Sequence, residues 1–135
     1  MNRIVRLSIT LLVLFTASAS MAAQSVATFV GLWEGVDPND GGHQILSITD
    51  NGDGTLKLLL RDTTYTLCPT DEGISKGTGI IQPDGILNAA NFTLMCLATE
   101  TLQSTPTSFQ LKKGVLYRIR TAPLDPIDYH QTSNH

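Results

Sequence analysis

The sequence predicts an all-β domain: a single antiparallel meander of about seven or eight strands that forms a small barrel or a flattened sandwich. Two observations carry this prediction. Apolar residues recur at every second position along most of the chain, and short motifs rich in Gly, Asn, Asp and Pro separate these runs. Alternation of this kind is typical of antiparallel strands that bury one face. No window shows a sustained helical period.

The strand predictions rest on six alternating runs. In one of them Leu56, Leu58 and Leu60 share a face, and Lys57 and Arg61 lie on the other. The runs in chain order are QILSITD (44–50), TLKLLLR (55–61), TTYTLC (63–68), NFTLMCL (91–97), TSFQLKK (107–113) and VLYRIR (115–120). The segment ILNAAN (86–91) is compatible with a strand or with a helical turn.

Turn motifs between the runs predict hairpins and short loops. They are DPNDGG (37–42), DNGDG (50–54), CPTDEG (68–73), QPDG (82–85) and KKG (112–114). Asn-Gly and Asp-Gly tolerate the positive φ that hairpin turns require. A calcium loop of the EF-hand type needs side-chain oxygens at its third and fifth positions, where DNGDG has Gly52 and Gly54. We therefore interpret DNGDG as a turn, and we predict no metal site.

The loop DPNDGG (37–42) is a second candidate for a calcium site. Counted from Asp37, its fifth position is Gly41 and its twelfth is Ile48, so it also fails the EF-hand pattern. Asp37, Asn39 and Asp40 still converge on one short loop without a base, which leaves calcium as a less favoured alternative.

The N-terminal residues predict export. Arg3 and Arg6 precede an uncharged run, residues 7–19, which is followed by small residues; this is the pattern of a signal peptide. We expect residues 1–22 to be the leader, cut after Ala19 or Ala22, with an uncleaved membrane anchor as the less favoured alternative. Residues 23–122 would form the barrel or sandwich domain, and residues 123–135, which carry two prolines, a flexible tail. The expected localisation is secreted or periplasmic, without stable membrane insertion after cleavage.

The charge and the cysteine content further limit which functions and covalent bonds we expect. The chain has nine Lys and Arg and twelve Asp and Glu, and the leader removes two of the bases, so the exported part carries a net charge of −5. Nucleic-acid binding is disfavoured, because phosphate backbones require clustered bases. In an exported protein the two cysteines, Cys68 and Cys96, most simply form one disulfide.

Catalytic motifs are absent from the sequence. It contains no G-x-S-x-G elbow, no H-E-x-x-H and no P-loop. Of its three histidines only His43 lies in sequence expected to be ordered, and a nucleophile needs a base within hydrogen-bond reach. We expect a protein that is not an enzyme and has no cofactor.

The segment FVGLWEG (29–35) places Gly31 and Trp33 at the start of the first strand. A G-x-W pair opening an exported meander resembles the signature of the calycins, the small β-barrels that include the lipocalins and avidin-like proteins. The resemblance implies a barrel whose base is closed by Trp33. It also implies that a basic side chain from the far end of the chain, Arg118 or Arg120, packs across the indole as a cation–π partner.

Two functions follow from this reading. The first is a non-catalytic binding module for a small apolar ligand at the barrel mouth, which predicts a cavity. Its ligand-binding residues would be Trp33, Tyr65, Phe92 and Tyr117. The alternative is an inhibitor or interaction protein that acts on a secreted or periplasmic partner, which predicts a filled core and a rigid acidic loop. The loop GVDPNDGGHQ (35–44) would then supply the partner-binding residues Asp37, Asn39, Asp40 and His43.

Overall fold

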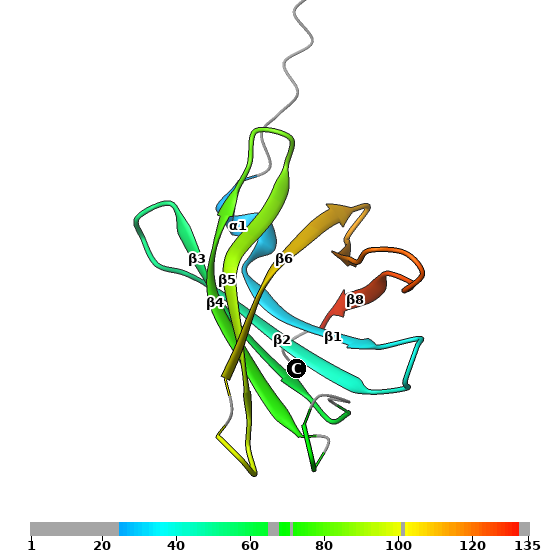
Figure 1. Ribbon diagram of the computed structural model, residues 1–135. Coiled ribbons are helices and arrows are strands. Elements are labelled where there is room, and N and C mark those ends of the chain that lie inside the picture. Colours follow the sequence, from blue (N-terminus) through cyan, green and yellow to red (C-terminus); the bar gives the residue numbers. More distant parts are fainter. Residues whose placement is uncertain (1–24, 65–67, 71, 101, 133–135) are drawn as a thin grey trace, which may run out of the picture.

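The protein is a closed barrel of eight antiparallel strands in simple up-and-down order (Figure 1). The computed structural model describes residues 25–64, 68–70, 72–100 and 102–132. A short helix, α1 (Val26–Phe29), precedes the strands. The strands are β1 (Gly31–Val36), β2 (His43–Asp50), β3 (Thr55–Asp62), β4 (Gly73–Ile81), β5 (Ile86–Cys96), β6 (Leu102–Lys112), β7 (Val115–Ile119) and β8 (Ile127–Gln131). The all-β meander is confirmed, and of its two forms the barrel is the correct one.

Alternating apolar side chains fill the barrel. In β3, for example, Leu56, Leu58 and Leu60 are fully buried while the residues between them are exposed. Aromatic rings also pack together in the core: Phe109 packs edge-on against both Phe92 and Tyr129. The buried core comprises Phe29, Trp33, Leu46, Ile48, Leu56, Leu58, Leu60, Leu87, Ala89, Phe92, Phe109, Leu116, Ile127 and Tyr129.

One end of the barrel, which we call the helix end, is covered by α1. Phe29 of this helix is fully buried in the core, and the indole Nε1 of Trp33 donates a hydrogen bond to the Phe29 carbonyl at 2.9 Å. Trp33 is therefore buried at the helix end of the barrel. None of the helices in the described part of the chain is long and apolar enough to span a membrane.

The C-terminal segment corrects the sequence prediction. Residues 123–135 were expected to form a flexible tail, but Ile127–Gln131 form β8, which pairs with β7 on one side and β1 on the other. Ile127 and Tyr129 are both fully buried. The segment is too short and too rich in proline for its alternation to stand out, yet its pairing with β1 and β7 closes the barrel.

The structure differs from the predicted strands in two further places, β4 and the run 63–68. β4 was not predicted, because glycine occupies inward positions where apolar side chains would reveal a strand. A Cβ on Gly77 would lie 2.5 Å from the Asn91 carbonyl oxygen, and one on Gly79 would lie 2.7 Å from a Leu87 methyl group. The run 63–68 was predicted as a strand, but Thr63, Thr64 and Cys68 belong to the β3–β4 connection, and residues 65–67 lie outside the described residues.

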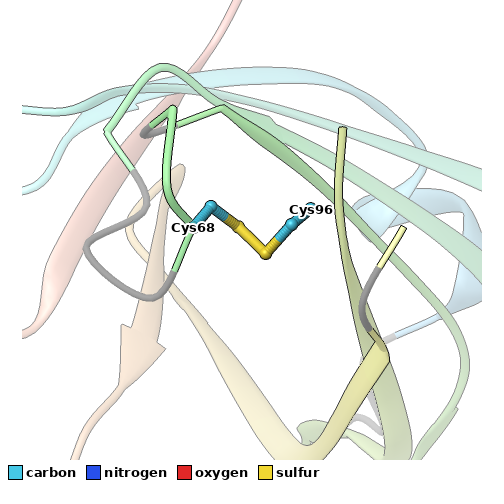
Figure 2. Close-up of a disulfide and its surroundings, with 2 residues drawn as sticks. All are labelled: Cys68 and Cys96. Carbon is cyan, nitrogen blue, oxygen red and sulfur yellow. A yellow bond between two sulfur atoms is a disulfide. The ribbon is translucent and has the colours of Figure 1, made fainter. Parts of the chain in front are cut away.

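The predicted disulfide is present. Cys68 in the β3–β4 connection is bonded to Cys96 at the end of β5, with 5.3 Å between their α-carbons (Figure 2). Both cysteines are buried and pack with Leu94 in a small cluster separate from the main core. The bond fixes the β3–β4 connection onto the neighbouring hairpin.

Candidate functional site

The end of the barrel opposite α1, which we call the loop end, carries the β1–β2, β3–β4, β5–β6 and β7–β8 connections. The β1–β2 loop, residues 37–42, is held by a set of internal hydrogen bonds. The Asp37 carboxylate accepts hydrogen bonds from both the backbone and the side-chain nitrogen of Asn39, each at 2.9 Å. The Asp37 backbone also bonds Gly41 and Gly42, and Asp40 Oδ1 accepts the Gly42 N–H. The loop is therefore held by its own backbone and side chains.

A distant arginine completes this loop. Arg120, which follows β7, places Nη1 2.8 Å from each carboxylate oxygen of Asp37. Burial alone would raise the pKa of Asp37, but the hydrogen bonds from Asn39 and Arg120 and the charge of Arg120 lower it below its ordinary value. Asp37 is thus an ionised anchor with little exposed surface.

A buried polar group lies beneath the loop. Gln44 Nε2 donates to Asp62 Oδ2 at 2.5 Å, Tyr129 donates its hydroxyl hydrogen to Gln44 Oε1, and the Thr64 N–H donates to Asp62 Oδ1. Burial raises the pKa of Asp62, the negative charges of Asp40 and Asp37 act in the same direction, and the hydrogen bonds offset this only in part. This group of side chains was not predicted from the sequence, although Asp62 continues the inward alternation of β3.

The position of Gly42 has no room for a side chain, because two carboxylates occupy the space that a side chain would need. A Cβ on Gly42 would lie 2.7 Å from Asp62 Oδ1 and 3.0 Å from Asp40 Oδ1. The loop and the buried group are therefore packed directly against each other. A larger residue at this position would push the two acids apart or displace the loop.

The predicted partner-binding residues divide into two kinds. Asp37 is buried and has a structural role in holding the loop. Asn39, Asp40 and His43 are exposed, and His43 Nε2 lies 3.8 Å from Glu34 Oε2 on the outer surface. These three side chains form the accessible part of the candidate site.

The predicted ligand-binding aromatics do not share one space. Trp33 and Phe92 are packed into the core. Tyr117 is half-buried and follows Leu116, which faces the core, so alternation places Tyr117 on the outer face of β7. Tyr65 lies outside the described residues. The expected arginine contact with Trp33 is also corrected: Arg118 lies 5.9 Å from the Phe92 ring centroid, and Arg120 binds Asp37.

A pocket of about 270 Å³ lies beside the loop end, on the outside of β2, β3 and β4. Ile45 and Ile74 lie on either side of Arg61 in the strand register, and Leu97 contributes a further apolar wall. His43 of the candidate site belongs to the same lining. Within the described ranges, no three His, Cys, Asp or Glu side chains gather as metal ligands.

Comparison with known proteins adds no family. No protein-family model matches the chain, and neither a curated protein nor a solved structure matches it. The closed eight-stranded antiparallel meander is compatible with a calycin-like fold. No family match confirms the calycin resemblance.

Proposed function

We propose that this protein is an exported, non-catalytic interaction protein that binds a secreted or periplasmic protein through its loop end. The observation that carries the proposal is the construction of the β1–β2 loop, in which Asp37 is bound by Asn39 and by Arg120. A loop that is already ordered loses little conformational entropy on binding, so more of the contact energy becomes affinity. The disulfide supports the export part of the proposal.

The surroundings of the loop suit a protein partner. Asp40 is exposed on a chain whose exported part would carry net negative charge, which favours approach by a basic surface. The pocket beside His43 has an apolar lining of Ile45, Ile74 and Leu97 and can receive an apolar side chain of the partner. The proposed site therefore combines a charged loop with an adjacent apolar pocket.

A small apolar ligand inside the barrel has less support. Trp33 and Phe92, two of its predicted binding residues, are in contact with the protein's own core. A small barrel can be filled by its side chains and leave no room for a ligand. We therefore prefer the interaction protein to the ligand carrier.

The first test is a charge reversal with a matched control. Asp40→Lys alters the loop end, whereas Asp84→Lys makes the same change at the helix end. The match is close, because each carboxylate accepts a backbone N–H two residues further along, from Gly42 and Ile86 respectively. Proteins captured from the exported fraction of the source would be purified, and their affinity for each variant would be measured by calorimetry.

The expected result is that Asp40→Lys weakens binding by about tenfold or more, as like charges face each other, while Asp84→Lys leaves the affinity unchanged. Higher salt should weaken binding by wild type more than binding by Asp40→Lys. Equal effects of the two substitutions would contradict the assigned site. A small apolar molecule that copurifies in native mass spectra would favour the ligand carrier instead.

A further inference from the structure

On one side, strand β6 extends well beyond the residues that pair with β7. β5 pairs with β6 from Leu102 onward, but β7 pairs only with Ser108–Lys112. After β7 the chain turns toward Asp37 through Arg120 and does not continue along β6. In the described part of the chain, no strand covers this side of residues 102–107, which we call the free edge. Figure 1 shows β6 (gold) continuing from its label toward the β5–β6 turn.

The free edge lacks the charged side chains that commonly prevent strand association, although its pairing with β5 shifts register between Ala89 and Phe92, next to Pro106. Leu102 is 68% exposed, and the following residues up to Pro106 are exposed as well. An unpaired edge presents backbone N–H and C=O groups to any other strand, and proteins commonly block such edges with charged side chains. The stretch from Leu102 to Leu111 contains no charged residue. Pro106 removes one donor and is the sole common blocking residue in the free edge.

The alternation of β6 defines how a second copy would fit. Thr107 is buried, so Thr105 and Gln103 face the same side, and Leu102, Ser104 and Pro106 face outward. A twofold axis perpendicular to the sheet pairs residues that share a face. With the axis at Ser104, Leu102 of one copy lies opposite Pro106 of the other, and Gln103 lies opposite Thr105. This register covers the most exposed leucine with an apolar ring and places no like charges opposite each other.

We propose that the chain forms a twofold symmetric dimer through antiparallel pairing of its free edges, centred on Ser104. The occupant of the edge is a second copy because the uncharged strand is complementary to itself in this register. The interface is short, so the dimer is weak and its population depends on concentration. The proposal rests on β6 and is independent of the proposed function at the β1–β2 loop.

Charge substitution at the axis gives a specific test. In Ser104→Lys two ammonium groups face each other across the axis, and in Ser104→Asp two carboxylates do. The dimerisation constant of the oxidised protein would be measured by sedimentation equilibrium over a series of concentrations. We expect each variant to dimerise more weakly than wild type by more than about tenfold, since like charges in an interface are repulsive. An equimolar mixture of the two should form a heterodimer again.

A second substitution on the same strand serves as control. Gln110 also faces outward on β6, but it is paired with Ile86 of β5 and Tyr117 of β7. Gln110→Lys should therefore leave dimerisation at the wild-type level, and thermal melts confirm that every variant is folded. A wild-type protein that stays monomeric at all concentrations would overturn the proposal. So would a dimer that Ser104→Lys does not weaken, or a Lys and Asp mixture that remains monomeric.

Discussion

Arg120 and Asp37 are 83 positions apart in the sequence, yet Arg120 Nη1 contacts both carboxylate oxygens of Asp37 at 2.8 Å. The contact joins the chain after β7 to the loop between β1 and β2, so it ties the two ends of the meander together at the loop end. Because Asp37 is buried and Arg120 is largely covered, water screens this pair less than an exposed ion pair. It therefore links the stability of the fold to the shape of the candidate site.

Replacing Arg120 should destabilise the protein. Arg120→Met leaves the Asp37 carboxylate buried without its cation, and we expect the free energy of unfolding to fall by about 1–3 kcal/mol. Urea denaturation measures this loss. Arg61→Met is the control, because Arg61 is exposed on the outside of β3 and should cost less than about 0.5 kcal/mol. Equal losses in the two variants would show that the ion pair contributes nothing.

The same substitution should change the response to acid. The pKa of Asp37 is lowered in the folded state, so its contribution is fully present above the unfolded pKa of about 3.9 and is lost as the pH falls through the folded pKa. Wild type should therefore lose part of its stability below about pH 4. Arg120→Met should lose less stability over that range. An equal fall in the free energy of unfolding of the two proteins with falling pH would contradict the assignment of this effect to Asp37 and Arg120.

Asp62 should affect the pH dependence of stability in the opposite direction to Asp37. Its pKa is raised by burial and by the charges of Asp40 and Asp37, so the folded state binds a proton more readily than the unfolded chain. Asp62 therefore lowers stability at neutral pH, and protonation removes this cost as the pH falls toward the unfolded pKa of about 3.9. Compared with Asp62→Asn, which cannot titrate, wild type should gain stability between neutral pH and about pH 4. A constant difference between the two proteins across this range would refute the prediction.

The barrel could be predicted from the sequence because most of its strands show their inward face. Leu56, Leu58 and Leu60 identify β3 without ambiguity, and the Asn-Gly and Asp-Gly motifs mark hairpins. β4 has glycines at inward positions, so the large side chains that fill the space belong to other strands. β8 is short and contains only Ile127 and Tyr129 as buried anchors. A period-two signal needs several large side chains in succession, and these two strands do not provide them.

The candidate site was predictable only in part, for a different physical reason. The turn motif places Asn39 and Asp40 in an exposed loop, and the structure agrees. That Asp37 is buried depends on Arg120, and the group around Asp62 depends on Tyr129 from the last strand. Such contacts arise when distant strands meet at barrel closure, and no local pattern encodes them.

Loss of the disulfide should lower stability strongly. The bond joins residues 28 positions apart, and the chain-entropy estimate for a loop of that size is about 3.5 kcal/mol. We expect Cys68→Ala with Cys96→Ala to lower the urea midpoint to that of the reduced wild type. Thiol titration of the unfolded, unreduced protein should find no free thiol. Full reactivity of both cysteines, or a midpoint that a reductant does not change, would argue against a stabilising bond.

Trp33 tests whether the helix end closes the barrel as described. Its indole is 1% exposed, and its hydrogen bond to the Phe29 carbonyl holds α1 against the first strand. Trp33→Ala leaves a large cavity, and we expect it to cost about 3–5 kcal/mol. Leu32→Ala changes the neighbouring residue on the outer face, which is 38% exposed, and should cost less than about 1 kcal/mol.

A conservative variant separates the packing of Trp33 from its hydrogen bond. Trp33→Phe retains most of the apolar volume but removes the donor to Phe29, so its cost should lie between those of the two alanine variants. Hydrogen exchange should show faster opening of residues 28–30 in Trp33→Phe than in wild type, because α1 loses its attachment to β1. Unchanged urea midpoints in both Trp33 variants would mean that the indole is exposed and that α1 does not seal the barrel.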